Sequence, residues 1–120
     1  MTGRRAERGA ATAELVMVLP ALVAVTLGLV WLLSIGAAQL RVVDAARETA
    51  RALARGDAQA EAVARGREVG PAETRIAVSS TEGDVVVTAK ARVRGPGGLF
   101  AGLSGVTVHA EAVAVAEETT

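Results

Sequence analysis

The chain of 120 residues lacks cysteine, has few aromatic residues, and contains one long stretch without charge. The absence of cysteine excludes disulfides, thiol chemistry and zinc-thiolate sites. Aromatic residues make up only 2% of the chain although 51% of it is hydrophobic, which is unusual for the core of a soluble protein. The formal net charge is zero, so the composition does not favour a nucleic-acid partner.

The uncharged stretch covers residues 15–40 and predicts one membrane-spanning helix. A helix of this length, at about 1.5 Å per residue, exceeds the roughly 30 Å of hydrocarbon in a bilayer. Pro20 lies inside the stretch and is a candidate site for a kink. The roughly 80 residues outside it can form only a small core.

The charges flanking this stretch predict its orientation. Arg4, Arg5 and Arg8 precede it together with a single acid, Glu7, whereas the chain without residues 1–9 has 10 basic and 12 acidic residues. Basic residues tend to stay on the cytoplasmic side of a membrane. We therefore expect a single-pass protein in the cell membrane, with a cytoplasmic N-terminus and an exported C-terminal part.

The helical pattern continues beyond the membrane, so we predict one helix over about residues 11–55 with Gly56 as its C-cap. Its outer half is amphipathic. The predicted apolar stripe contains Leu40, Val43, Ala46, Ala50 and Leu53, and the opposite charged stripe contains Arg41, Asp44, Glu48, Arg51 and Arg55. A shorter helix, capped by Asp57, is expected over residues 58–65 and is closed by Gly66 and by Gly70-Pro71.

From Thr74 onward the apolar residues alternate with a period of two, which predicts strands. Residues 81–84 are typical of a hairpin turn, a third strand is expected over residues 106–116, and residues 99–103 could form a helical turn before it. The predicted fold class is α+β, with a three-stranded antiparallel sheet on the amphipathic half of the long helix. Glu111 is expected to face Lys90 or Arg92 across strands.

The predicted organisation has three parts: a leader over residues 1–9, the membrane and amphipathic helix over residues 10–56, and a small exported domain over residues 57–120. Gly9 precedes a run of small residues and would give a protease an extended, open peptide at the membrane face. Cleavage after Gly9 would leave Ala10 with a new α-amino group, one helical turn before Glu14. This amine, in the same or a neighbouring subunit, could neutralise the carboxylate, which is costly at the head of a membrane span.

These residues carry a family resemblance. Gly9, four further residues and Glu14 at the head of a long apolar helix resemble the processing site of type IV prepilins, and RGAATAELVMVLPALVAVTLGLVWL resembles the N-terminal region of TadE-like minor pseudopilins of the tight-adherence (Tad, or Flp) system. The resemblance implies processing by a membrane prepilin peptidase and a role in assembling or initiating a pilus. The implied partners are membrane lipid, that peptidase, other pilins and the pilus assembly platform.

Two differences favour a minor pseudopilin over a major pilus subunit. Leu15 follows Glu14 where major Flp pilins carry an aromatic residue such as tyrosine, and those subunits are little more than the helix, whereas this chain has a further domain. A separate difference, Ala10 in place of the phenylalanine with which other type IV pilins begin, bears on N-methylation of the mature N-terminus and not on this choice. The alternative is an uncleaved single-span anchor whose exported domain binds an envelope or secretion component.

Other interpretations of single features stay open. A secretory signal peptide could be cut near Gly36, although the apolar run is longer than a signal core of about 7 to 15 residues. Glu14 could be a flanking charge that the helix dipole favours. His109 is the sole histidine and is expected on a strand surface, not in a metal site. No catalytic motif or phosphate loop is present in the sequence, so we expect no enzyme activity, cofactor, metal or small-molecule substrate.

Overall fold

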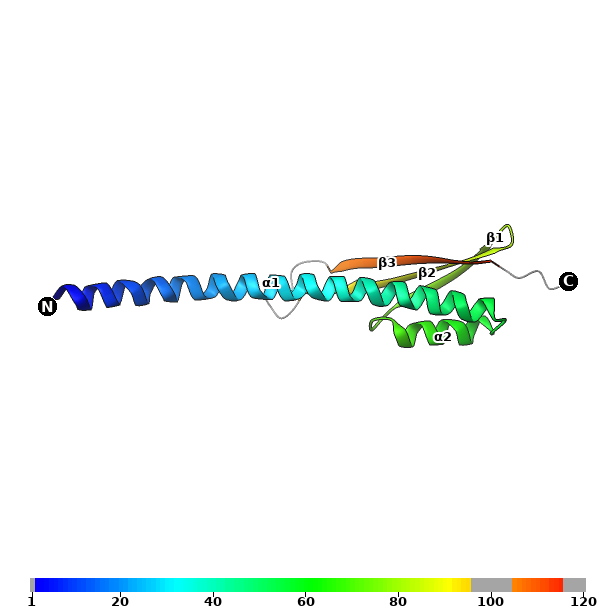
Figure 1. Ribbon diagram of the computed structural model, residues 1–120, viewed down its shortest axis with the longest axis horizontal. Coiled ribbons are helices and arrows are strands. Elements are labelled where there is room, and N and C mark those ends of the chain that lie inside the picture. Colours follow the sequence, from blue (N-terminus) through cyan, green and yellow to red (C-terminus); the bar gives the residue numbers. More distant parts are fainter. Residues whose placement is uncertain (1, 96–104, 116–120) are drawn as a thin grey trace. The chain divides into compact units, whose positions relative to one another are not determined.

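The computed structural model describes residues 2–95 and 105–115, and in this part of the chain two helices precede three strands (Figure 1). Helix α1 spans Thr2–Ala54 and α2 spans Gln59–Val69. The strands are β1 (Arg75–Thr81), β2 (Asp84–Val93) and β3 (Val106–Val115). The chain divides after Leu32 into two compact units, so α1 contributes to both. The predicted α+β fold class is confirmed, whereas the helical turn expected over residues 99–103 lies outside the described residues.

The first unit contains one element, the N-terminal part of α1. Every described side chain from Gly3 to Thr26 is exposed, including large apolar ones such as Met17, which is 80% exposed. The helix is long and apolar enough to cross a membrane, and no part of its most apolar window is buried within the chain. It continues through Pro20 without a break in the helical assignment. The apolar surface of this unit therefore has no cover from the described chain.

Helix α1 ends where Gly56 takes a backbone conformation that other residues rarely adopt. Its φ is +90°, its N–H donates to the carbonyl of Leu53 at 3.0 Å, and the N–H of Asp57 donates to the carbonyl of Ala52 at 3.1 Å. This pair of bonds is the Schellman motif, in which a glycine follows the helix. The predicted C-terminal role of Gly56 is confirmed.

Helix α2 differs from its prediction at its N-cap and at Gly66, whereas the predicted stop at Gly70 is confirmed as its C-cap. Its N-cap is Ala58, without a side-chain hydrogen bond, whereas Asp57 pairs with arginines instead of capping. The helix also continues through Gly66 to Val69. Gly66 does not end it but lies in close contact with α1. A Cβ at Gly66 would stand 2.0 Å from Oγ1 of Thr49 and 3.0 Å from the carbonyl oxygen of Ala45. Gly66 therefore allows two helices to approach closely and is not a stop signal.

The three strands form one antiparallel sheet in the order β1-β2-β3. The predicted hairpin is confirmed: Thr81 pairs with Asp84, and Glu82 and Gly83 have φ of 53° and 89°, as a two-residue type I′ turn requires. The prediction for Glu111 was wrong, because Thr88 stands opposite it and Lys90 pairs with His109. The third strand begins at the predicted residue, Val106.

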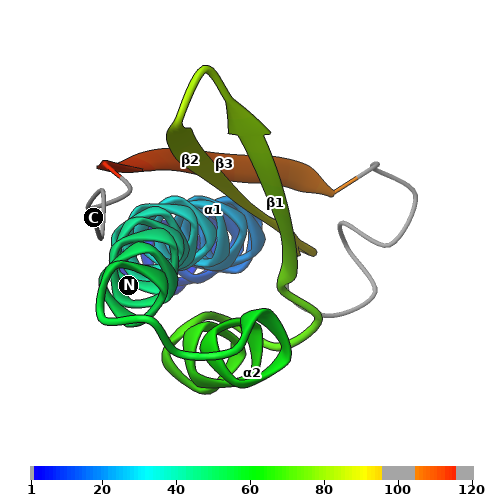
Figure 2. The ribbon, with the colours of Figure 1, turned by 90° about the vertical axis from the view of Figure 1, so that its right-hand side faces the viewer.

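The core of the second unit lies between the sheet and the helices, with α1 and α2 on the same side of the sheet (Figure 2). Its fully buried members are mostly alanine, and Val42 and Val87 are the largest apolar ones. The predicted stripe was right for Ala46 and Ala50 but wrong for Leu40, which is 69% exposed. Small side chains let the helix lie close to the sheet, so the buried face centres on alanines and not on the leucine.

Candidate processing and assembly site

The residues predicted to direct processing all lie on the exposed N-terminal part of α1. Arg4, Arg5 and Arg8 stand on its first turns, and all three side chains are exposed. The helix begins at Thr2 and not near residue 11, so the expected start was wrong. Alanine, arginine and glutamate dominate residues 4–8 and favour helix, which explains why the leader continues the helix without a break.

The predicted scissile bond, between Gly9 and Ala10, therefore lies inside a helix and not in an extended peptide. A Cβ built at Gly9 meets no atom within 4 Å. The fold itself consequently does not require glycine at this position. Glycine does lower local helix stability by about 1 kcal/mol relative to alanine, which favours the local unwinding that a protease needs.

Thr12 links the two sides of this bond, and the sequence interpretation did not single it out. Its hydroxyl Oγ1 donates to the carbonyl oxygen of Arg8 at 2.8 Å, four residues earlier. Threonine often makes this contact within a helix, so the spacing alone could have suggested it. Cleavage after Gly9 would remove the acceptor and leave the hydroxyl of Thr12 available to a new partner.

Glu14 stands one helical turn after Ala10, about 6 Å further along the axis, and is exposed at the start of the apolar surface. Within residues 2–95 and 105–115 no basic group forms an ion pair with its carboxylate. In the uncut chain it also lies far from the helix N-terminus, whose first turn contains no acid. The carboxylate is therefore placed for a partner that the uncut chain does not supply.

Comparison with protein families gives one result for this segment. The family model described as TadE-like protein matches residues 9–51, which include Gly9, Glu14 and the whole apolar stretch. The N-terminal segment is TadE-like. Comparisons with curated proteins and with solved structures find no match. The predicted resemblance is confirmed over these residues, and it associates the chain with Tad pilus systems.

The TadE-like segment extends from the first unit into the second, because its last residues pack against the sheet. Ala38, Val42 and Ala46 belong to the core cluster, and Gln39 donates from Nε2 to the carbonyl oxygen of His109 at 3.0 Å. His109 itself is exposed on the outer face of β3 as predicted. The described residues contain no group of three His, Asp or Glu side chains close enough to share a metal ion.

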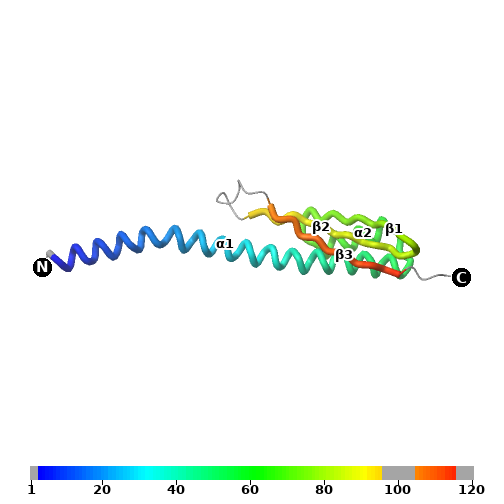
Figure 3. The backbone as a smooth tube through the Cα atoms, turned by 90° about the horizontal axis from the view of Figure 1, so that it is seen from above, coloured from blue at the N-terminus to red at the C-terminus, as the bar shows by residue number. Residues whose placement is uncertain are grey.

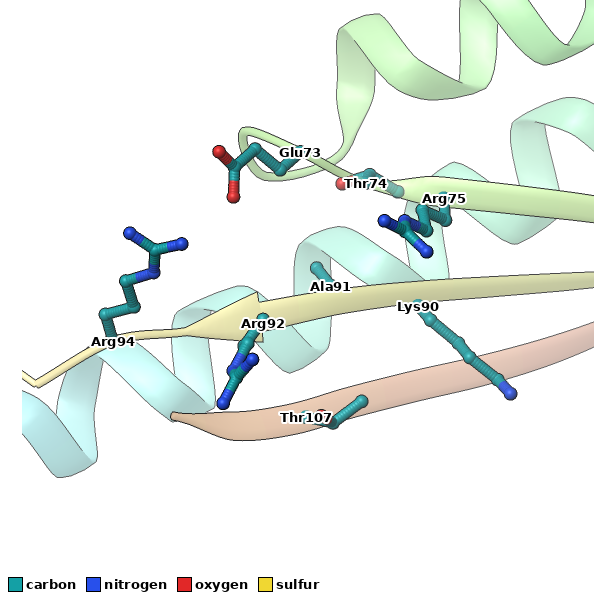
Figure 4. A pocket seen from close by; sticks show the side chains of 8 residues that line it. All are labelled: Glu73, Thr74, Arg75, Lys90, Ala91, Arg92, Arg94 and Thr107. Carbon is teal, nitrogen blue, oxygen red and sulfur yellow. The ribbon is translucent and has the colours of Figure 1, made fainter. Parts of the chain in front are cut away.

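A second charged feature lies outside the TadE-like segment, and sequence reasoning missed it. Basic side chains gather around a hollow at the end of β2, beside the beginnings of β1 and β3 (Figure 4). The residues lining it are Glu73, Thr74, Arg75, Lys90, Ala91, Arg92, Arg94 and Thr107. Strand register places Arg75 opposite Lys90 and Arg92 opposite Thr107. The alternation along β2 already puts Lys90, Arg92 and Arg94 on one face, and only the addition of Arg75 depends on the pairing with β1.

Proposed function

We propose that the chain is a minor pseudopilin of a Tad-type pilus, made as a precursor that a prepilin peptidase cuts after Gly9. It crosses the cell membrane once, with the leader in the cytoplasm and the second unit outside. The mature chain, beginning at Ala10, takes part in assembling or initiating the pilus with other pilins and the assembly platform. Catalysis belongs to the peptidase, for which this chain is a substrate.

The observation that carries the proposal is an unpaired acid at the head of an uncovered apolar helix. Glu14 has no ion-pair partner among the described residues, and the side chains that follow it, such as Leu15 and Met17, are 61% and 80% exposed. A membrane or neighbouring helices would cover this apolar surface. The TadE-like match covers Gly9, Ala10 and Glu14.

Cleavage would change the electrostatics at Glu14. The cut removes the carbonyls of residues 6–9, so the first four amide positions of the shortened helix lose their acceptors, and a positive amine appears at Ala10. Free N–H groups at a helix start stabilise an acid in the first turn by about 0.3–1 kcal/mol at an exposed site, and Glu14, the fifth residue of the mature chain, lies just after that turn. The amine of the same chain or of a neighbour adds a direct partner. Processing thus makes the position of Glu14 favourable and fixes the register of adjacent helices.

An uncleaved membrane anchor is the second candidate, and one observation favours it. The Gly9–Ala10 bond lies within a continuous helix, so the peptide is not presented in an open form. In this alternative the second unit, which has its own core, binds an envelope or secretion component. The two candidates differ in the N-terminus of the protein extracted from membranes.

The test is the intact mass of the chain expressed with a Tad prepilin peptidase, in wild-type form and with Gly9→Ala or Gly3→Ala. Both glycines are exposed helix positions where a Cβ meets no atom within 4 Å, so neither change disturbs the fold. We expect wild type and Gly3→Ala to begin at Ala10 and Gly9→Ala to remain uncut. A full-length wild-type chain, or cleavage of Gly9→Ala at the wild-type rate, would contradict the assigned site.

The role of Glu14 is tested separately by Glu14→Gln, with Glu7→Gln as the control because the cut removes residue 7. Processing should stay within about twofold of wild type in both variants. Co-purification with partner pilins should fall about tenfold or more for Glu14→Gln, since each lost 1.4 kcal/mol of pairing is a factor of about ten. Unchanged association would refute the proposed charge pair.

A further inference from the structure

We infer that the basic cluster at the end of β2 binds anionic phospholipid headgroups of the leaflet from which α1 emerges. The cluster consists of Arg75, Lys90, Arg92 and Arg94. The inference rests on one part of the proposed function, the insertion of α1 in a bilayer. It is independent of cleavage and of pilus assembly.

The first step is the charge of the surface. The hollow has a volume of about 720 Å³, and four basic side chains line it against one acid, Glu73. No ion pair connects any of these groups within the described residues. Arg75, Lys90, Arg92 and Arg94 are all exposed, and Figure 4 shows Arg94 turned toward Glu73 while Arg92 and Lys90 extend over β3. Guanidinium and ammonium groups in such a cluster suit phosphate oxygens.

The second step is the open edge of β2 beside the cluster. Pairing between β1 and β2 begins at Arg75 and Lys90, so β2 extends beyond the start of β1 by three residues, Ala91 to Val93. Among the described residues, no strand pairs with Ala91 to Val93 on the side of β1. The exposed arginine side chains at this end are therefore open to a headgroup from that side of the described chain.

The third step is the height of the cluster along the part of α1 that belongs to the second unit. Figures 1 and 3 show that β3 begins beside the cyan part of α1 and runs toward its green end, so β2 runs the opposite way, toward lower residue numbers of the helix. The contact between Gln39 and His109 fixes the level, since His109 pairs with Lys90. Arg92 lies two residues further along β2, or about 7 Å. A distance of about 7 Å equals between four and five helical residues, which brings Arg92 level with about Ile35.

The fourth step compares this level with the bilayer. Hydrocarbon of about 30 Å needs about 20 helical residues, so a span that begins at Leu15 ends near Ser34. The core of the second unit begins at once, because Ile35 packs against its cluster and Ala38 belongs to it. No spacer separates the span from the domain. We therefore expect Arg92, level with about Ile35, to lie just beyond the end of the span, where the lipid headgroups begin.

The experiment uses the full chain in lipid nanodiscs made of neutral phosphatidylcholine, or of a mixture that contains phosphatidylglycerol. The chain has no cysteine, so Thr107→Cys and Val113→Cys each give one labelling site on the outer face of β3, at opposite ends of the sheet. A fluorophore at each site is quenched by a tracer lipid with a nitroxide on its headgroup. Trp31, the sole tryptophan, reports insertion of α1 through quenching by lipids brominated in the acyl chain.

We expect quenching at Thr107→Cys to exceed that at Val113→Cys by about threefold or more in anionic discs, and to fall in neutral discs or at high salt. The triple variant Arg75→Gln, Arg92→Gln, Arg94→Gln should lose most of this excess. The matched control, Arg47→Gln, Arg51→Gln, Arg67→Gln, removes the same charge from exposed helix positions of the second unit and should keep it. The salt dependence of the wild-type chain tests the inference even if a variant misfolds.

Two results would overturn the inference, and they are distinguishable. If Trp31 is not quenched by brominated lipid, α1 is not in the bilayer, and the proposed membrane protein fails together with the headgroup site. If Trp31 is quenched but the label at Thr107→Cys is indifferent to anionic lipid and to salt, only the headgroup site fails. A protein partner with an acidic surface would then be the better occupant of the cluster.

Discussion

The two units of the chain use the same helix in opposite ways. In the first unit, α1 exposes nearly all of its leucines and valines, and Leu33, at the boundary with the second unit, is still 74% exposed. In the second unit, the same helix buries Val42, Ala45 and Ala46 completely. The larger apolar side chains are thus the exposed ones, and the smaller ones form the core.

This contrast shows where each half of α1 obtains its stability. A side chain packed on a sheet must fit a fixed space, so the second unit selects alanine and valine that let the backbone approach. Lipid chains are fluid and adapt to the side chains that they contact, so a lipid-facing segment has no limit on side-chain size. Leucine is therefore tolerated on every face of such a helix. After about residue 35, the side chains of α1 must therefore have the right size to fit against the sheet. Before it, they need only be apolar.

The strongest way to break the comparison is to place a carboxylate in each half. Val87→Asp would bury an unpaired charge at the centre of the sheet and should destabilise the second unit by about 3–5 kcal/mol or more, most of a small domain's stability. Val25→Asp changes an exposed residue of the first unit and should leave the second unit protease-resistant. It should make the free energy of membrane insertion less favourable by about 2.5–3.5 kcal/mol. Limited trypsin digestion and membrane fractionation measure the two effects. Protease sensitivity in both variants would show that the units are not independent.

A pair of glycines gives a smaller and sharper contrast. Gly66→Ala places a methyl group against Thr49 and Ile76 and should cost about 1–3 kcal/mol, which corresponds to a fall of about 4–24 °C in the melting temperature of the second unit. Gly28→Ala meets no atom within 4 Å and should be neutral or slightly stabilising. Circular dichroism at 222 nm in detergent measures both. Equal melting temperatures would contradict the close approach of the two helices.

Local signals in the sequence predicted the parts of the fold that local chemistry determines. Glu82 and Gly83 supply the positive φ of a two-residue hairpin, and Gly56 supplies the left-handed residue after α1, so both turns were predicted correctly. Gly66 was misinterpreted because a helix-breaking residue and a residue in close helix contact look the same in a sequence. Leu40 was placed in the core because hydropathy does not distinguish a sheet from lipid or solvent.

The candidate site divides in the same way. Gly9, Ala10 and Glu14 were predicted from their spacing, which is local, and the TadE-like match covers all three, whereas cleavage and charge pairing stay predictions. The basic cluster was not predicted as a site, although alternation along β2 places Lys90, Arg92 and Arg94 on one face of the strand. Only the addition of Arg75 depends on hydrogen bonding between strands, which places it opposite Lys90.

The smallest expected effect concerns Asp57, which joins α1 to α2. Its carboxylate lies 3.3 Å from Nη2 of Arg55 and 4.0 Å from Nη1 of Arg65, and the arginine side chains are 45% and 55% exposed. Exposed pairs of this kind contribute at most about 1 kcal/mol, and salt screens them. Asparagine in place of this aspartate would cap a helix equally well but cannot form an ion pair.

The two substitutions Asp57→Asn and Asp57→Ala therefore separate the two roles. If Asp57 acts only through its arginines, both variants should lower the free energy of unfolding equally, by less than about 1 kcal/mol, and the loss should disappear in concentrated salt. If it caps α2, Asp57→Asn should match wild type and only Asp57→Ala should be destabilised. Chemical denaturation at low and high salt decides between these outcomes, with Glu111→Gln, an exposed acid on β3 without an ion pair among the described residues, as the control. Equal effects of the two substitutions would assign the contribution of Asp57 to its ion pairs with Arg55 and Arg65, and not to a cap.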